Sequence, residues 1–465
     1  MFVLMLAWPM PELSPEAHRL AAIATFVVIW WITEALPIPI TAILGAALAV
    51  LFGVATPTAA FAPFADPIMF LFIGSFILSR GIVVQGVDVR VAAAVLAIPL
   101  VGRSFTLTCF AVTAVAVMLS AWMSNMAVTA MMLPVFLAVL RTAPSSAGSA
   151  VPRTMLLVLC YAASIGGMIT PVGAAPNLIT IGFLDSLGGT TISFLEWVVV
   201  GLPISVTMVV LLLVVARPKL PPFRVPPTGA VEQAALTGNW SVGQVNATIA
   251  FATAVVLWVL PGVLTAIAPN STITELFDSR LDEGIAAILG AALLFVLPVD
   301  WSRRQFTITW AEASKIDWGT ILLLGGGFSL GRMMFETGLA AHVAQGIIAI
   351  SGAETLWTIT AIATLVAILL TEVTSNTAAT SMLAPVVIAI ALAAGVDPVA
   401  PAIGTCLGAS LAFMLPISTP SNAIVYGTGL VPLGAMIRYG VIMDVIGFFV
   451  IQVGLWILVP LLGHA

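Results

Sequence analysis

The chain has 465 residues, of which 61% are hydrophobic and only 8% carry a charge, and its formal net charge at pH 7 is −5. Since about a quarter of the residues in a soluble domain are charged, this composition excludes a soluble globular protein. Repeated apolar stretches of about 20 residues are typical of membrane-spanning helices. The sequence therefore predicts an all-α integral membrane protein that crosses the bilayer many times.

The sequence carries little of the chemistry that an enzyme or a metalloprotein needs. Its cysteines, Cys109, Cys160 and Cys406, lie in apolar runs at unrelated spacings, which favours free core residues over disulfides or a metal site. The three histidines are far apart, and the sequence has no His, Asp and Glu cluster and no nucleophile beside a base. We expect no enzymatic activity, no cofactor and no nucleic-acid partner.

Apolar segments follow one another along the whole chain. Met1 to Trp8 is too short to span a bilayer and lacks the basic region of a signal peptide, so either a first span begins at Met1 or the natural chain starts upstream. The longer segments lie at about 20–36, 40–54, 67–86, 88–101, 105–140, 154–185, 193–216, 246–268, 282–298, 318–352, 356–394, 399–430 and 434–462. The longest polar break, 217–246, separates two halves of similar size.

These two halves repeat each other. Ser124-Asn125 in the first half recurs as Ser375-Asn376 in the second, 251 positions later. Three further pairs of segments match in the same order, at offsets of 245 to 252 positions: Ala42–Leu48 with Ala287–Leu293, Gly74–Phe76 with Gly326–Phe328, and Thr170–Asn177 with Leu415–Asn422. Four ordered matches at nearly one offset indicate an internal duplication.

The charges at the segment ends indicate that the two copies face opposite sides of the membrane. Arg103, Arg141 and Arg153 flank the first Ser-Asn segment, whereas Glu354 and Asp397 flank the second. Because cytoplasmic loops are rich in Lys and Arg, we expect the first segment to open to the cytoplasm and the second to the outside. Such an inverted-topology repeat is typical of secondary transporters.

The uncharged stretch 105–140 is too long for one span and tight for two, and the stretch 356–394, whose single charged residue is Glu372, has a similar length. We expect two re-entrant helical hairpins, each with its Ser-Asn tip near the bilayer midplane. Ser and Asn are preferred helix N-caps, so the second arms are expected to begin near Met126 and Thr377. Two helix N-termini would then face each other and form an anion site without a basic side chain.

A second pair of interruptions follows further along each half. Gly173–Asn177 and Ser418–Asn422 place helix-breaking and polar residues inside the long apolar stretches 154–185 and 399–430, where we expect two broken helices. Unwound backbone exposes carbonyl oxygens, which suit Na⁺ together with side-chain oxygens. The hairpin tips would supply the remaining oxygens, from Ser120, Ser124 and Asn125 in one half and Thr371, Ser375 and Asn376 in the other.

Several of these features also have a structural interpretation. A single Ser-Asn pair in a membrane helix commonly joins helices, although its duplication makes packing alone a weaker explanation. Glu372 is compatible with a proton relay or with a structural cap. Glu34 and the pair Arg80 and Arg332 are better explained as structural or interfacial residues than as substrate ligands. A channel would need a continuous polar pore, whereas the polarity here is concentrated at one depth.

The chain closely resembles the divalent anion:sodium symporter family, which comprises di- and tricarboxylate and sulfate transporters. The resemblance covers nearly the whole chain and rests on Trp30–Pro39, on the two Ser-Asn tips and on Pro416–Asn422. Ser375-Asn376-Thr377 reproduces the family's doubled Ser-Asn-Thr signature in full. The resemblance implies about eleven membrane-spanning helices, a homodimer in the cell membrane (a bacterial inner membrane), and an elevator movement of a transport domain.

The resemblance also implies a division of the chain and a set of site residues. The scaffold comprises residues 1–104 and 247–355, the transport domain comprises 105–216 and 356–465, and 217–246 is a cytoplasmic linker. A first sodium site would use Ser120, Ser124, Asn125 and Gly173, and a second would use Thr371, Ser375, Asn376 and Ser418. The substrate would contact Ser124, Asn125, Ser375, Asn376, Thr377, Thr419 and Pro420.

Two departures from the family pattern lie in the first half. Met126 stands where the signature has Thr, and Gly173-Ala174-Ala175-Pro176-Asn177 stands where the family often has Gly-Thr-Pro-Pro-Asn. A hydrogen bond to a charged partner contributes about 1.5–3 kcal/mol, so these changes bear on the choice of anion. We expect Na⁺-coupled symport of small divalent anions, foremost C4-dicarboxylates such as succinate. Sodium-independent dicarboxylate exchange and sulfate transport stay open as alternatives.

Overall fold

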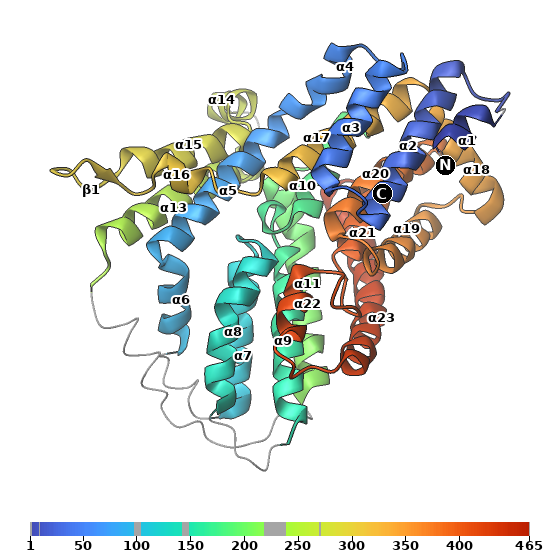
Figure 1. The fold of residues 1–465 in the computed structure, drawn as a ribbon. Coiled ribbons are helices and arrows are strands. Elements are labelled where there is room, and N and C mark those ends of the chain that lie inside the picture. The colour runs from blue at the N-terminus through green and yellow to red at the C-terminus, as the bar shows by residue number, and fades with distance from the viewer. Residues whose placement is uncertain are drawn as a thin grey trace.

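The computed structural model describes residues 2–8, 10–96, 104–141, 148–217, 239–268 and 271–464. These residues form an almost entirely helical assembly (Figure 1). Most of the expected linker at 217–246 lies outside them, as does Arg103, which contributed to the predicted orientation. The described part of the chain holds one small sheet, in which β1 (Pro298–Asp300) pairs antiparallel with β2 (Gln305–Phe306).

The order of the helices repeats between the two halves. The first half contains α1 (Phe2–Ala7), α2 (Pro15–Thr33), α3 (Ile38–Leu51), α4 (Pro57–Phe61), η1 (Ala62–Ala65), α5 (Pro67–Gln85), α6 (Val87–Leu96), α7 (Phe105–Ser120), α8 (Asn125–Arg141), α9 (Ala150–Gly167), η4 (Pro171–Gly173), α10 (Ala175–Ser186) and α11 (Phe194–Ala216). The second half contains α13 (Val242–Ile267), α14 (Thr272–Arg280), α15 (Glu283–Val296), α16 (Trp310–Ala313), α17 (Trp318–Glu336), α18 (Leu339–Ser351), α19 (Leu356–Thr371), α20 (Asn376–Ala393), α21 (Val399–Ala409), α22 (Pro420–Tyr426), α23 (Leu433–Leu458) and η6 (Val459–Leu462).

Only some of these helices are long enough to cross a membrane. In the described residues, six helical segments have the length and apolarity of a span, and the bent pair α17 and α18 adds a seventh candidate. The arms of the expected hairpins are shorter. At 1.5 Å per residue, the 16 residues of α7 reach roughly 24 Å, less than the ~30 Å hydrocarbon core. An arm of this length suits a segment that enters the bilayer and turns back.

Two matched helix crossings join the long helices outside the hairpins. α5 packs along α15, and α17 packs along α3. Gly74 of α5 lies against Ala287 of α15, and Gly326 of α17 lies against Ala42 of α3. A Cβ on these glycines would come within 2.6 Å and 2.5 Å, respectively, of alanine atoms. Small residues therefore let the helix axes approach closely, as they do in membrane helix pairs generally.

The helices are interrupted at all four predicted places. New helices begin at Asn125 and Asn376, one residue before the predicted starts. The Oγ atoms of Ser124 and Ser375 each accept the N–H of the third residue beyond, at 3.2 Å, so these two serines act as N-caps. The second pair of interruptions lies between α9 and α10 and between α21 and α22.

The hairpin arms and the broken helices of the two halves interlock. α8 packs against α22, and α20 packs against α10, so each hairpin contacts the broken helix of the other half. In Figure 1, α22 lies beside α9 at the centre of the molecule, between the cyan first hairpin and α23. Because each hairpin contacts the broken helix of the other half, the four interruptions lie in one region.

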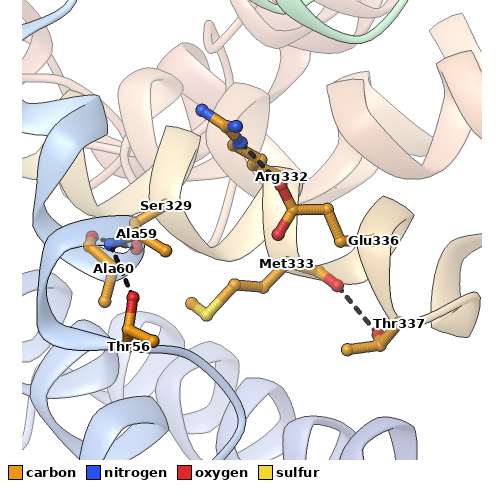
Figure 2. Close-up of polar contacts among 8 residues, drawn as sticks. All are labelled: Thr56, Ala59, Ala60, Ser329, Arg332, Met333, Glu336 and Thr337. Atoms are coloured by element: carbon orange, nitrogen blue, oxygen red, sulfur yellow. Dashed lines mark hydrogen bonds and ion pairs between the residues drawn. The ribbon is translucent and has the colours of Figure 1, made fainter.

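Figure 2 shows polar contacts along α17 and the neighbouring α4. The hydroxyl of Ser329 donates to the carbonyl of Ala60 at 2.7 Å, which ties α17 to the end of α4. Arg332 Nε donates to Glu336 Oε1 at 2.7 Å, one turn along the same helix. This contact pairs Arg332 within its own helix, in line with its structural interpretation.

The close crossing of α17 and α3 predicts a stability difference between two glycine variants. Gly326→Ala places a methyl group against Ala42 and should lower the free energy of unfolding by about 1–3 kcal/mol. Gly346→Ala in α18 meets no atom within 4 Å, and the better helix propensity of Ala makes that variant at least as stable as the parent. Thermal unfolding of both purified variants measures the difference, and equal midpoints would contradict a tight crossing.

Candidate functional site

A cavity of about 420 Å³ lies where the four interruptions meet, and its size is typical of small-molecule sites. All seven residues predicted to contact the substrate line it, together with Gly173 and Ser418 from the predicted sodium sites. The seven are Ser124, Asn125, Ser375, Asn376, Thr377, Thr419 and Pro420. Ser120 and Thr371, the remaining predicted sodium ligands, are fully buried behind the tips.

The first hairpin tip holds more oxygen acceptors than hydrogens to satisfy them. The Ser120 hydroxyl lies 2.7 Å from Asn125 Oδ1 and 2.6 Å from the carbonyl oxygen of Ala163 in α9. A hydroxyl has a single hydrogen to donate, so one of these two acceptors does not receive it. The result is a small cluster of oxygen atoms from two helices.

The second hairpin tip repeats this arrangement. The Thr371 hydroxyl lies 2.8 Å from Asn376 Oδ1 and 2.7 Å from the carbonyl oxygen of Ala409 in α21. The predicted ligands of both sodium sites thus occupy equivalent positions in the two halves. The carbonyls of Ala163 and Ala409 were not predicted, because the sequence does not show which turn of α9 or α21 reaches the tips.

Gly173 lies among backbone oxygens. A Cβ on this residue would come within 2.6 Å of the Gly167 oxygen, 2.9 Å of the Ala121 oxygen and 3.1 Å of the Ser120 oxygen. Three carbonyl groups therefore converge on a place that only glycine leaves open. Oxygen ligands of this kind suit a small, hard cation, so the residues present fit a sodium ion at the first site.

Ser418 occupies the position of Gly173 in the second half, and its surroundings differ. Its hydroxyl lies 2.9 Å from the Glu372 carbonyl oxygen and 2.7 Å from Glu372 Oε2. The same carboxylate accepts the backbone N–H groups of residues 413, 414 and 415 at 2.8–3.1 Å. These contacts make Glu372 a cap on the unwound backbone that follows α21.

Two asparagines close the broken helices. Asn177 Nδ2 donates to two backbone carbonyls of its own break, at 2.8 Å and 2.7 Å. Asn422 Nδ2 does the same in the second half, at 2.8 Å and 3.0 Å. Helix ends leave carbonyl groups without a partner, and these carboxamides supply one. The sequence analysis placed both residues in the breaks but did not predict that they bond back across them.

Helix N-termini supply the positive charge of the cavity. α8, α10 and α20 all begin at its wall, and no Lys or Arg is among the described residues that line it. The first two N–H groups of α8, at residues 125 and 126, and of α20, at residues 376 and 377, have no acceptor among the described residues, whereas the next N–H of each helix bonds the capping serine. Each helix N-terminus carries a partial charge of about +0.5. The cavity therefore has the chemistry of an anion site built from backbone.

Part of the cavity wall was not predicted from the sequence. Ser75 and Ser79 of α5, Ile38 of α3 and Thr320 of α17 all line it. Asp317 lies there too, but its carboxylate accepts the N–H and the hydroxyl of Thr320, at 3.1 Å and 2.6 Å, and so caps α17. Ser79, Asp317 and Thr320 stand outside every matched motif, whereas Ser75 and Ile38 belong to the motifs Gly74–Phe76 and Trp30–Pro39, and only the fold brings all five to the cavity.

The two tips differ at one exposed position. Met126 is 51% exposed and lines the cavity. Thr377 stands at the equivalent place of the second tip and carries a hydroxyl group instead. The first tip thus presents an apolar surface where the second presents a hydrogen-bond donor.

The whole chain matches one family of membrane transporters. The family pattern described as the sodium:sulfate symporter transmembrane region covers residues 1–462. An uncharacterized transporter of Haemophilus influenzae is 32% identical over 94% of this chain and 91% of its own length. The sodium-dependent dicarboxylate transporter SdcS of Staphylococcus saprophyticus is 30% identical over 99% of this chain and 90% of its own length.

Two solved transporter structures share the fold at low identity. The YdaH transporter of Alcanivorax borkumensis has a TM-score of 0.60 at 17% identity and covers 93% of this chain and 98% of its own. MtrF of Neisseria gonorrhoeae has a TM-score of 0.57 at 11% identity and covers 98% of this chain and 97% of its own. The predicted family, multi-pass membrane location and lack of enzymatic function are therefore confirmed: this chain belongs to the sodium:sulfate symporter family of membrane transporters.

Proposed function

We propose that this protein is a secondary active transporter that carries small divalent anions, C4-dicarboxylates such as succinate, together with Na⁺. The observation that carries the proposal is the meeting of three helix N-termini and two oxygen clusters at one cavity. Relatives named sodium-dependent dicarboxylate transporters support the same ion and substrate class.

The charges at the cavity provide a reason for coupling. Helix N-termini carry only partial charges, and without a lining Lys or Arg they do not neutralise a dianion. A sodium ion at each oxygen cluster would add a full charge. At a separation of about 6 Å and an effective dielectric constant of about 20, one such pair attracts by roughly 3 kcal/mol. That energy corresponds to roughly a hundredfold in affinity, so each ion would favour binding of the other.

The shape of the site favours a dicarboxylate over a single-centred anion such as sulfate. Each hairpin tip offers its own helix N-terminus, and a C4-dicarboxylate has one carboxylate for each. The methylene groups between them would then lie beside Met126, whose exposed side chain is apolar. Ser124, Asn125, Ser375, Asn376 and Thr377 would contact the carboxylates, with Thr419 and Pro420 completing the wall.

The sodium ligands in this proposal come from both tips and both broken helices. Ser120, Ser124, Asn125 and Gly173 would hold one ion, and Thr371, Ser375, Asn376 and Ser418 the other. At the first site, the carbonyl oxygens that converge on Gly173 support the assignment. At the second, Ser418 shares its hydroxyl with Glu372.

We further propose that the substrate crosses by an elevator movement in a homodimer. The interlocked hairpins and broken helices, 105–216 and 356–465, would move against 1–104 and 247–355. The closely packed pairs α5 with α15 and α3 with α17 support a rigid scaffold. The two halves make matching contacts, which supports an inverted repeat. In such a repeat the same set of contacts serves the state open to the cytoplasm and the state open to the outside.

A ligand panel tests the transport proposal. Purified protein should gain thermal stability from succinate only when Na⁺ is present, because binding to the folded state adds about 2.7 kcal/mol at a hundredfold excess over Kd. Choline replaces Na⁺ in the control, and sulfate is compared with succinate. Stabilisation by succinate in choline would favour sodium-independent exchange, and stabilisation by sulfate alone would favour a sulfate transporter.

Gly173 offers a test of the first sodium site. Gly173→Ala would place a methyl group among three carbonyl oxygens, so the Na⁺ concentration that half-saturates succinate binding should rise at least tenfold. Gly434→Ala, where no atom lies within 4 Å, is the matched control and should bind like the parent. Calorimetric titration of succinate at a series of Na⁺ concentrations gives both values. An unchanged Na⁺ dependence in Gly173→Ala would remove Gly173 from the site.

Restoring a hydroxyl to the first tip tests the role of Met126. Met126→Thr makes this tip match Thr377 and should tighten succinate binding about tenfold, since a hydrogen bond to a charged group contributes about 1.5–3 kcal/mol. Met126→Val changes the shape without adding a donor and should not tighten binding. If both variants bind succinate as the parent does, the side chain at this position does not contact the substrate.

A further inference from the structure

The boundary between the two parts of the proposed elevator runs between α17 on one side and α10 and α20 on the other. α17 belongs to the proposed scaffold and packs against both of the other helices (Figure 1). No hydrogen bond or ion pair among the described residues joins α17 to α10 or α20. Ser381 of α20 faces α17 here, and its buried hydroxyl has no partner among those residues. Packing alone therefore holds these helices together.

Within each of the two parts, by contrast, hydrogen bonds join the helices. In the proposed scaffold, the Ser329 hydroxyl of α17 lies 2.7 Å from the carbonyl oxygen of Ala60. In the other part, the Thr371 hydroxyl lies 2.7 Å from the carbonyl oxygen of Ala409, which ties the second hairpin to α21. Moving α17 away from α10 and α20 thus breaks no hydrogen bond between them, whereas separating helices inside either part does.

Two Gly-Phe steps meet across this boundary, Gly182-Phe183 in α10 and Gly327-Phe328 in α17. A Cβ on Gly182 would overlap the Phe328 ring. A Cβ on Gly331, one turn beyond Gly327, would come within 2.8 Å of the Phe183 ring. The two rings pack edge to face with their centroids 4.7 Å apart, an arrangement that aromatic pairs favour. Each phenylalanine therefore fills a notch that a glycine of the other helix leaves open.

Both rings are buried in this contact, Phe183 completely and Phe328 to within 4% of its surface. Large buried rings contribute much of the packing energy where two elements meet. Because each ring occupies a notch on the opposite helix, α10 cannot move along α17 until both rings have left their notches. The contact resists movement of one part against the other, and it can form again without any hydrogen bond to restore.

The internal repeat identifies the matching residues in the other halves of these helix pairs. The offsets of the matched segments relate Gly327-Phe328 to Ser75-Phe76 in α5, and Gly182-Phe183 to Gly427-Thr428 at the end of α22. Inverted repeats exchange such contacts when a transporter changes the side to which it opens. The matching contact would hold a single ring, Phe76, which in the structure lines the cavity instead. The observed arrangement is thus the one whose contact contains two rings.

We propose that the paired Gly-Phe steps form a clasp that holds α10 against α17 in the observed arrangement and opens once in each transport cycle. This inference rests on the proposed function, because it requires the two parts to move against each other. The clasp contains two rings where the matching contact contains one, so it favours the observed arrangement over the opposite one. Phe183 and Phe328 are positioning residues, since neither of them lines the cavity.

A reversible cross-link tests whether this boundary opens during transport. A Cβ on Gly327 would lie 3.4 Å from the Ser381 Cβ, close to the distance within a disulfide, and the natural cysteines are buried. Gly327→Cys with Ser381→Cys should therefore bridge on oxidation. In liposomes with a Na⁺ gradient, the bridged protein should take up no succinate although it still binds it, and a reductant should restore uptake. Uptake by bridged protein at the rate of the reduced protein, or failure to bridge, would overturn the proposal.

Distance measurements between spin labels test the clasp itself without any ligand. The labels are attached at Gly346→Cys in α18 and Gly434→Cys in α23, where a Cβ meets no atom within 4 Å, and they report the separation of the two parts. Phe183→Ala should shift the ratio of the two arrangements about tenfold away from the observed one, the upper end of the effect of an aromatic pair. Phe328→Ala should shift it equally, and the double variant no further, since all three remove the same contact.

Phe183→Leu keeps a buried apolar side chain without the ring, and it serves where the Ala variant does not fold. If the distances are unchanged in every folded variant, there is no clasp, because a merely structural role does not alter the balance between the two arrangements. If the parent takes up no succinate, the proposed function fails, while the distances still decide whether the clasp holds the two parts.

Discussion

The site depends on breaking four helices inside a membrane without leaving backbone groups unpaired. An unpaired N–H or C=O in hydrocarbon costs several kcal/mol, so every break needs a local substitute for the missing helix bonds. Asn177 and Asn422 supply it for the carbonyl groups of the two broken helices. Ser124 and Ser375 supply it for N–H groups at the tips. The first N–H groups of α8 and α20, at residues 125, 126, 376 and 377, keep no acceptor among the described residues and lie at the cavity wall, where they can meet an anion.

The sequence shows where the breaks are because they depend on local chemistry. Ser-Asn pairs, prolines and glycines in apolar stretches mark all four, and the starts of α8 and α20 differ by one residue from the predicted ones. The contacts across the breaks depend on helices that meet only in the fold. No local pattern shows that Ala163 reaches the first tip or that Asp317 lines the cavity.

The duplication makes the differences between the halves informative. Where the second half has Thr377, Ser418 and Glu372, the first has Met126, Gly173 and Ala121. The hydrogen bonds of the hairpin tips are nevertheless the same, within 0.1 Å for each matched pair. The backbone geometry is thus insensitive to these exchanges, and the polar groups have accumulated on one side of the cavity. The two halves of the cavity wall therefore differ in polarity, although the hydrogen bonds of their hairpin tips match.

The composition of the cavity wall gives a physical reason for coupling anion binding to sodium in the proposed function. A lysine or arginine in the wall would bind a dianion permanently and hinder its release. Helix N-termini attract anions with partial charges only. The rest of the dianion's charge must therefore be neutralised by ions that can dissociate again. In the proposed function, sodium ions at the two oxygen clusters would meet this requirement. An anion site built from backbone is therefore one whose affinity depends on the cations available on each side of the membrane.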